Sequence, residues 1–243
     1  MSHLFTYTDM LAHFGVTVAH PGGRGMTEKA VSLLPIAAGT KIAELGCGLG
    51  DTARWLSEEK GAIVYGIDAH PLMISKARKR HKDQQEKKKL HFLQSDASRV
   101  PFPDHMMDGM LAESVLSFAD VHDVLRECRR LLRPGGFFAS LDLVADQDFT
   151  APDKKSYGEF YGMKNVLTKK EWIRLLEDYG FTVEHVIEER PGEAGTDESI
   201  PELVMSRDIP ADCYELMEQH VHLLEKYQSW TGYAYFICKY DRA

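Results

Sequence analysis

Three glycines stand close together in the segment 42–52, which reads IAELGCGLGDT. An apolar, strand-like run precedes them and a helix-like stretch follows. Without a Cβ, Gly46 and Gly48 let the backbone turn sharply and contact a ligand, while Gly50 permits close packing of the helix on the strand. The helix N-terminus then presents unpaired N–H groups and the positive end of its dipole. This combination indicates a site for a ligand that carries a carboxylate or a phosphate.

Two kinds of ligand compete for such a turn, a dinucleotide and a nucleoside of another kind. Dinucleotide sites favour the pattern GxGxxG, but here Gly50 comes one position early and Asp51 stands where that pattern has its third glycine. A carboxylate beside a pyrophosphate would weaken binding by charge repulsion. The spacing therefore disfavours NAD and FAD, and a nicotinamide-dependent oxidoreductase stays as the alternative function.

Alternating strand-like and helix-like segments must position this turn. Such alternation is typical of an α/β protein in which a parallel sheet is covered by helices on both faces. Asp51 and Thr52 are suitable caps for the helix that follows the turn, and Pro71 is suited to open the next one. The expected strands are 41–45, 63–67, 91–94, 107–112, 137–143, 182–187 and 233–239, and the expected helices are 51–60, 72–81, 121–132, 169–179 and 211–227.

Several segments, taken in order, resemble one family. ELGCGLG is similar to the first motif of Rossmann-like S-adenosylmethionine-dependent methyltransferases. Asp68, at the end of the second expected strand, matches the acidic residue that in this family accepts hydrogen bonds from both ribose hydroxyls. A carboxylate suits that task because two vicinal hydroxyls present two donors.

Later segments extend the resemblance over about 41–144. Asp96 and Ala97 resemble the family's adenine contact, and Glu113 begins a segment that matches the one along the methionine part. LLRPGGFFASLDL is similar to the turn before the fifth strand. VPFPDHMMDGM and LTKKEWIRLLEDYGF fit the small-molecule branch typified by quinone-biosynthesis and sterol C-methyltransferases.

The resemblance implies a three-layer Rossmann-like methyltransferase fold with a mostly parallel seven-stranded sheet, an antiparallel last strand and a small helical cover. It also implies S-adenosyl-L-methionine as cofactor and methyl transfer to a small-molecule acceptor. We expect one domain over 1–243, with 1–30 as an N-terminal cover and 145–166 and 190–230 as substrate lid segments. A catalytically silent protein that binds S-adenosylmethionine is a further alternative. The expected cofactor contacts are Gly22, Gly23, Thr27, Glu44, Gly46, Cys47, Gly48, Asp68, Ala69, Asp96, Ala97 and Glu113.

The N-terminal segment HPGGRGMT admits two interpretations. In one it is a flexible turn followed by Thr27 as a helix N-cap. In the other it folds over the mouth of the nucleoside site, so that Gly22, Gly23 and Thr27 touch the cofactor. His20 would then face the cofactor or the acceptor, and it is the first candidate for a general base because its ordinary pKa is near neutrality. Glu113 is the next candidate.

Other conspicuous residues have structural explanations beside the functional ones. Glu44 precedes the turn, where an orienting role is favoured over catalysis, and Cys47 is interpreted as a small apolar filler. Tyr157, Phe160 and Tyr161 form either the apolar face of a lid helix or a substrate contact. The basic run 78–89 is typical of the solvated end of a surface helix, with nucleic-acid binding as the alternative.

Composition limits the possible partners. The 243 residues include 37 acidic and 29 basic ones, a net charge of −8 that disfavours a nucleic-acid partner. No run approaches the roughly 20 apolar residues that span a bilayer, and the N-terminus lacks a signal-peptide pattern, so we expect a cytoplasmic protein without a membrane partner. The four cysteines form no CxxC motif or Cys/His cluster, which predicts no metal site. We expect a monomer or a homodimer.

Overall fold

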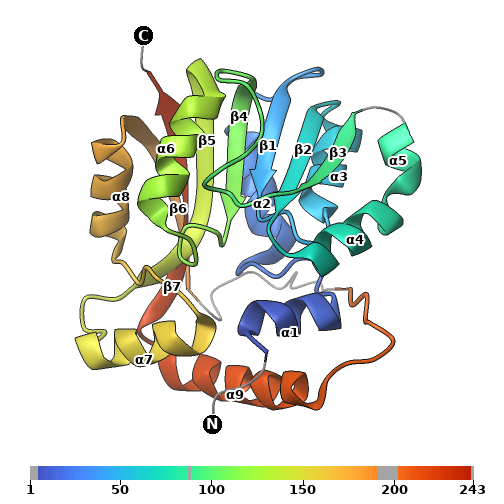
Figure 1. The fold of residues 1–243 in the computed structure, drawn as a ribbon. Helices are drawn as coiled ribbons and strands as arrows, with labels where there is room; N and C mark the ends of the chain where they lie inside the picture. The colour runs from blue at the N-terminus through green and yellow to red at the C-terminus, as the bar shows by residue number, and fades with distance from the viewer. Residues whose placement is uncertain (1–4, 87–88, 191–201, 242–243) are drawn as a thin grey trace.

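The structure is a computed structural model that describes residues 5–86, 89–190 and 202–241. Within these residues the sheet consists of β1 (Lys41–Leu45), β2 (Ile63–Asp68), β3 (Leu90–Gln94), β4 (Met107–Glu113), β5 (Leu132–Ala145), β6 (Phe181–Glu189) and β7 (Thr231–Tyr240). The strand order is β3-β2-β1-β4-β5-β7-β6 (Figure 1). Strands β1 to β5 run parallel, and β7 is antiparallel to β5 and β6. The predicted α/β class, the seven strands and the antiparallel last strand are confirmed.

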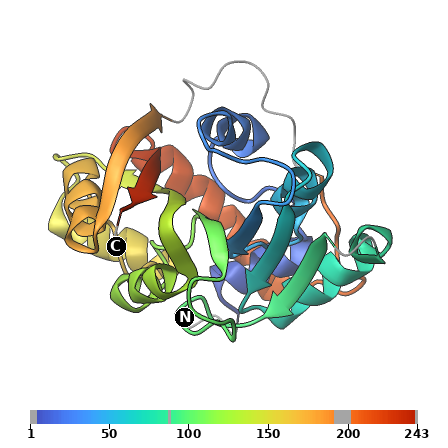
Figure 2. The same ribbon diagram turned by 90° about the horizontal axis from the view of Figure 1, so that it is seen from above.

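Helices cover both faces of this sheet, as Figure 2 shows from above. On one face α2 (Gly23–Ser32), α3 (Asp51–Glu59) and α4 (Pro71–Arg80) share an apolar cluster with β1 and β2. On the other face α6 (Val121–Leu131) and α8 (Lys169–Asp178) pack against β4 and β5. The short helix α5 (Lys82–Glu86) follows α4. Because the central strands are covered on both sides, β1 and β4 are buried almost continuously.

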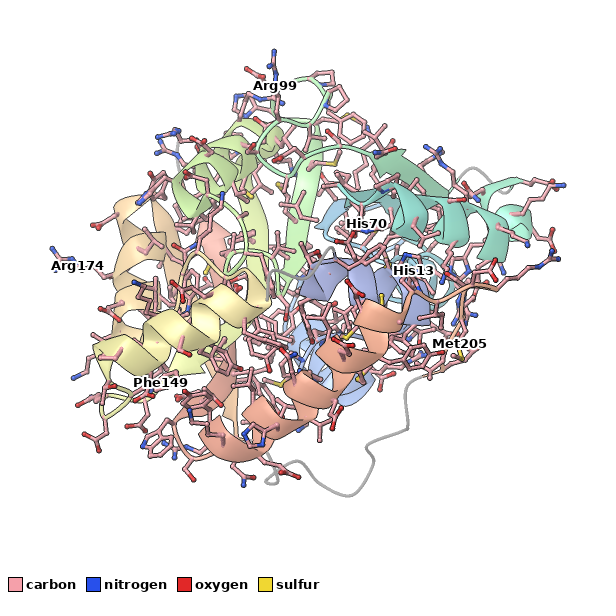
Figure 3. The ribbon with its side chains drawn as sticks, turned by 60° about the horizontal axis from the view of Figure 1, so that its bottom comes forward. His13, His70, Arg99, Phe149, Arg174 and Met205 are labelled. Atoms are coloured by element: carbon pink, nitrogen blue, oxygen red, sulfur yellow. The ribbon has the colours of Figure 1, made fainter. Side chains whose placement is uncertain are left out.

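A third group of helices covers the carboxyl ends of the strands. It comprises α1 (Tyr7–Phe14), α7 (Ala151–Tyr161) and α9 (Ala211–Tyr227), which lie side by side at the bottom of Figure 1 and in front in Figure 3. α1 begins with a capping box, in which the Thr6 hydroxyl accepts from the Asp9 amide and the Asp9 carboxylate accepts from the Thr6 amide. The expected segment 145–166 contains α7, and 190–230 contains α9. Of the latter segment, residues 191–201 lie outside the described residues.

Two local expectations are wrong. The N-cap of α3 is Gly50, with φ 80°, so Asp51 and Thr52 lie inside the first turn. Only glycine fits there, because a Cβ would lie 2.3 Å from the Phe92 ring. β5 begins at Leu132, before the Pro-Gly-Gly turn, and not at 137.

The helix of the N-terminal segment also begins earlier than a Thr27 cap would place it. Its N-cap is Gly22, in the left-handed conformation with φ 75°, and Thr27 lies within the helix at 1% exposure. A Cβ at Gly22 would stand 2.8 Å from the Cβ of Met26 and 2.9 Å from the Tyr233 ring. The glycine therefore lets α2 pack closely against one face of the sheet. Because Thr27 does not cap the helix, its hydroxyl is available for another hydrogen-bond partner.

Lys76 of α4 holds the cover onto the body of the protein. Its ammonium donates to the carbonyl oxygens of Ala12 at 2.8 Å, His13 at 3.2 Å and Val204 at 2.6 Å. The first two carbonyls belong to the C-terminal end of α1, where a cation also favours the helix dipole. Burial lowers the pKa of Lys76. The ammonium thus fixes α1 at its C-terminal end.

We expect Lys76→Met to lower the free energy of unfolding by about 1–2 kcal/mol, because three hydrogen bonds to a charged donor are lost while the aliphatic stem is kept. Hydrogen exchange should speed up mainly in α1. Lys79→Met is the control, because Lys79 lies exposed on the same helix. Equal stability and exchange in both variants would contradict this anchoring role.

Candidate active site

A cavity of about 1010 Å³ opens at the carboxyl ends of β1, β2 and β4. It lies where the strand order reverses between β1 and β4, the usual ligand crevice of an open α/β sheet. The cover helices α1, α7 and α9 close its other side. Ten of the predicted contacts line it, namely Gly22, Glu44, Gly46, Cys47, Gly48, Asp68, Ala69, Asp96, Ala97 and Glu113, whereas Gly23 and Thr27 are not among its lining residues.

The glycine turn has a different geometry at each glycine. Gly46 has φ 65°, and a Cβ there would lie 2.4 Å from Cγ2 of Val115. Gly48 has φ 52°, but a Cβ there would meet nothing within 4 Å. Gly46 is therefore required for packing, and Gly48 leaves open space on the cavity side. Cys47 is buried in the apolar cluster of the α2 face, as its interpretation as a filler predicts.

Asp68 is held rigidly at the end of β2. Its Oδ2 accepts from the Gly48 amide at 2.9 Å, and its Oδ1 accepts from the His70 amide at 2.8 Å. Burial raises the pKa of Asp68, which the two amides partly counteract. The turn after β1 and the carboxylate after β2 are thereby fixed to each other. The remaining lone pairs of the carboxylate can accept hydrogen bonds from a ligand.

Asp68 is also connected to the cover. His70, two residues further on, caps α4 through Nδ1, which accepts from the Leu72 amide at 3.2 Å. Its Nε2 lies 3.0 Å from Oδ1 of Asp9 in α1. Figure 3 shows His70 beside α1. A ligand at Asp68 would consequently lie next to the contact that joins α1 to the sheet.

Glu113 lies at the centre of a buried hydrogen-bond network at the end of β4. Its Oε1 accepts from the Thr27 hydroxyl at 2.6 Å and from the Tyr235 hydroxyl at 3.2 Å. Its Oε2 accepts from the Thr52 hydroxyl at 3.2 Å and lies 3.5 Å from Nε2 of His20. Burial raises the pKa of Tyr235, so that phenol stays protonated and donates. Thr27 therefore shapes the site through Glu113, and His20 is placed at the cavity wall beside the same carboxylate.

Glu44 lies in β1 behind the glycine turn, where its Oε2 has no hydrogen-bond partner among the described residues. Burial, with the nearby charges of Glu113, Asp51 and Asp68, raises the pKa of Glu44 well above its ordinary value. A buried carboxylate with one oxygen unsatisfied at a cavity wall is costly unless a cation or a donor reaches that oxygen. The lining thus suits a ligand that carries positive charge.

Replacing Glu44 by glutamine should make the ligand-free protein more stable at pH 8, by about 1 kcal/mol, because a buried unpaired charge is removed. A carboxyl whose pKa is raised on folding contributes stability at low pH that is lost as the pH rises through the folded-state pKa. The gain of Glu44→Gln over the native protein should therefore shrink between pH 8 and pH 5. Thermal unfolding at both pH values measures it. A stability gain of Glu44→Gln that is the same at both pH values would contradict a raised pKa of Glu44.

Asp96 follows β3 and is partly occupied by its own turn. Its Oδ1 accepts from the Ser98 amide at 2.8 Å and from the Ser98 hydroxyl at 2.7 Å. These hydrogen bonds lower the pKa of Asp96, helped by the charge of Lys164. The carboxylate is ionised and oriented, and the adjacent Ala97 also faces the cavity.

The sequence interpretation singled out none of nine further cavity residues, although all except Phe118 lie in the expected cover or lid segments 1–30, 145–166 and 190–230; they are Tyr7, Val16, Thr17, Val18, Ala19, Phe118, Lys164, His220 and Leu224. Only the Thr6–Asp9 capping box could have signalled α1. Within the described residues no group of three or more His, Cys, Asp or Glu side chains could hold a metal ion. In the same part of the chain, no helix has the length and apolar character needed to cross a bilayer.

The described residues of the basic run, 78–86 and 89, do not line the cavity, but they are less uniform than predicted. His81 is buried, and its Nε2 lies 2.9 Å from the Leu49 carbonyl oxygen. The guanidinium of Arg78 donates to the Phe92 carbonyl oxygen at 2.9 Å, and Arg80 contacts Asp51. Part of the run therefore ties α4 to the glycine turn and β3.

A family model described as a methyltransferase domain matches residues 43–140. A protein of Bacillus subtilis named uncharacterized methyltransferase YodH is 30% identical over 234 residues, which cover 95% of this chain and 97% of that protein. Demethylmenaquinone methyltransferase of Thermus thermophilus is 36% identical over 135 residues, 55% of this chain and 58% of that protein.

Solved methyltransferases share the fold. Geranyl diphosphate C-methyltransferase of Streptomyces coelicolor, in complex with S-adenosyl-L-homocysteine, aligns with a TM-score of 0.71 at 14% identity, over 90% of this chain and 76% of that one. Phosphoethanolamine N-methyltransferase 2 of Haemonchus contortus, in complex with S-adenosyl-L-methionine, gives 0.71 at 16% identity, over 97% and 57%. With the near full-length match to the Bacillus protein, these findings do not favour an oxidoreductase, and the chain belongs to the Rossmann-like S-adenosylmethionine-dependent methyltransferases.

Proposed function

We propose that this chain transfers the methyl group of S-adenosyl-L-methionine to a small-molecule acceptor inside the cavity at the carboxyl ends of the strands. The observation that carries the proposal is the grouping of open space at Gly48 with the buried carboxylates of Glu44 and Glu113 and the half-buried carboxylate of Asp68 around one cavity. A nucleoside joined to a cationic amino acid matches both the open turn and this acidic lining.

The turn residues would hold the cofactor through their backbone, and Asp68 would accept from the ribose hydroxyls. Asp96, Ala97 and Ala69 would surround the adenine. Glu44, with its unpaired Oε2, would lie near the positively charged amino-acid part, together with Glu113. Gly22 would cover the same part from the N-terminal segment, and we retain Gly23 and Thr27 as supports of this cover, because neither lines the cavity.

When bound, S-adenosylmethionine would supply a methyl group on a positively charged sulfur, ready for transfer to a nucleophilic acceptor atom. The protein must then position the acceptor and exclude water. The cover helices supply that enclosure. Where the acceptor atom carries a proton, His20 is our candidate to remove it, since it lines the cavity and Glu113 lies 3.5 Å from its Nε2.

The net charge and the cysteines bear on the partners and the location of the protein. The net charge of −8, and the place of the basic run outside the cavity, support the absence of a nucleic-acid partner. All four cysteines are buried and free, which is compatible with a cytoplasmic protein. We propose a single domain, active as a monomer or a homodimer, in which α7 and α9 form the lid over the acceptor.

Calorimetric titration with S-adenosylhomocysteine, and with NADH as the control, tests the cofactor. We expect saturable binding of the first and none of the second. Turnover is then tested with S-adenosylmethionine labelled on its methyl group, offered separately with small-molecule, protein and RNA fractions of a cell extract. Label in the small-molecule fraction supports the proposal. Absence of binding, or label only in protein or RNA, overturns it.

A further inference from the structure

The cavity continues beyond Glu113 into an aromatic part under the cover. We name this part the acceptor chamber and define it by Tyr7, Phe118, Leu143, Tyr157, Tyr161 and His220, all of which line the cavity. The total volume of about 1010 Å³ lies at the upper end of the roughly 300–1,000 Å³ typical of pockets for one small ligand. The cavity therefore has space for a second molecule beside the cofactor. Because the cofactor is assigned to the glycine turn and the carboxylates, this space lies in the acceptor chamber.

Packed rings fix the shape of the acceptor chamber. The ring centroids of Tyr7 and Tyr161 lie 4.8 Å apart in an edge-to-face arrangement, and those of Tyr157 and Tyr161 lie 4.6 Å apart. The Tyr161 hydroxyl is 3.0 Å from Nδ1 of His220, which joins α7 to α9. These rings offer apolar and quadrupolar surface together with a few polar groups. Such a lining recognises an apolar molecule by shape and orients it by hydrogen bonds.

The polar groups of the acceptor chamber stay uncharged near neutral pH. Burial raises the pKa of Tyr157 to about 12 and raises the pKa of Tyr7 and of Tyr161 as well. Burial also lowers the pKa of His220, which keeps its imidazole neutral. The phenols and the imidazole can therefore donate to or accept from a neutral ligand, and they supply no charge to balance an ionic one.

The charge of the whole cavity disfavours an anionic acceptor. Among the described residues, six carboxylates line it and one lysine, Lys164, whose charge acts on Asp96. A phosphate or diphosphate normally binds to several cationic groups or to a metal ion. The described part of the chain offers neither several lysine or arginine side chains nor a metal-binding cluster at this cavity.

We infer that the acceptor is an uncharged, largely apolar molecule with a hydroxyl or carbonyl group, held against the packed rings of Tyr7, Tyr157 and Tyr161, and not a phosphate ester or a carboxylic acid. This inference rests on the proposed function, since it assigns the acceptor of that same site. In the proposed function, Glu44 and Glu113 lie near the positively charged part of the cofactor. A cationic acceptor would compete with the cofactor for these two carboxylates.

The test uses three probes that share one naphthyl ring and differ in their polar group, on the full chain saturated with S-adenosylhomocysteine. They are 2-naphthol, 2-naphthyl phosphate and 2-naphthylmethylamine, and their affinities are measured by calorimetry at pH 7.5. We expect 2-naphthol to bind at least about tenfold more tightly than either charged probe. Tighter binding of the phosphate or of the amine, or binding of none of the three, overturns the inference. Since S-adenosylhomocysteine binding is measured first, its failure identifies a failure of the proposed function instead.

Two neighbouring residues of α7 locate the probe. Tyr161→Ala removes a chamber ring and should weaken 2-naphthol at least about fivefold, while the affinity for S-adenosylhomocysteine changes less than twofold. Phe160→Ala is the matched control, because Phe160 packs in the same cover but does not line the cavity. If Tyr161→Ala does not fold, Tyr161→Leu replaces it with the same expectation. Equal effects in the two positions would show that the probe binds elsewhere and overturn the assignment.

Discussion

Replacing Asp68 by alanine is expected to weaken binding of S-adenosylhomocysteine by about 1.5–3 kcal/mol, or roughly 10- to 150-fold. The substitution removes two interactions of the carboxylate. Ribose hydroxyls would lose a charged acceptor, and the Gly48 amide would lose the partner that fixes the glycine turn at 2.9 Å. Calorimetric titration of the folded variant measures the change.

Two controls separate these effects. Asp68→Asn keeps the size and one acceptor oxygen, so it should bind with intermediate affinity. Asp104→Ala removes an exposed carboxylate that pairs with Arg130 and does not line the cavity. It should leave the affinity within about twofold of the native value. Native affinity in Asp68→Ala would rule out the ribose assignment.

Gly46→Ala should destabilise the fold, whereas Gly48→Ala should impair binding in a folded protein. At Gly46 two costs add up in the alanine variant. The backbone is left-handed, and the new Cβ would lie 2.4 Å from Cγ2 of Val115. We expect a loss of about 2–4 kcal/mol in the free energy of unfolding, combining backbone strain with overpacking. At Gly48 only the backbone cost of about 1 kcal/mol applies, since a Cβ there meets nothing within 4 Å.

The affinity for S-adenosylhomocysteine distinguishes the roles further. Gly48 lines the cavity and has open space beside its Cα, so a methyl group there should weaken binding at least about tenfold. Gly135→Ala is the matched control, because Gly135 also has a positive φ, 76°, and open space, but lies outside the cavity. Denaturant unfolding and calorimetry on the three variants complete the test. Native-like binding in Gly48→Ala would mean that no ligand approaches this backbone.

The sheet and its glycine turn could be predicted because their signals are local. Short apolar runs mark buried parallel strands, and turn residues separate them from amphipathic helices. Pro71 is at the start of α4, and α9 has the bounds that its pattern predicts. Asp68 and Glu113 each end a strand, so the topology brings them to one cavity.

The arrangement of the cover could not be derived in the same way, although α9 itself was predicted, because the cover helices are stabilised by one another. Tyr7 and His220 come from opposite ends of the chain and meet with ring centroids 5.2 Å apart. No local pattern encodes such a contact. Thr27 shows a related failure, since its value as a helix cap was outweighed by a buried hydrogen bond to Glu113, 86 positions away. The early start of α2 depends on the fit of Gly22 beside Tyr233, which is equally non-local.

The two halves of the cavity have different origins in the chain. The glycine turn and the carboxylates of β1, β2 and β4 come from one continuous stretch, while the acceptor chamber is built mainly by α1, α7 and α9, which are far apart in sequence. If the acceptor binds in that chamber, exchanging cover segments between relatives would alter what is methylated without altering the methyl source. During evolution, substitutions in the cover helices could then change the methylated product while the cofactor site stays the same.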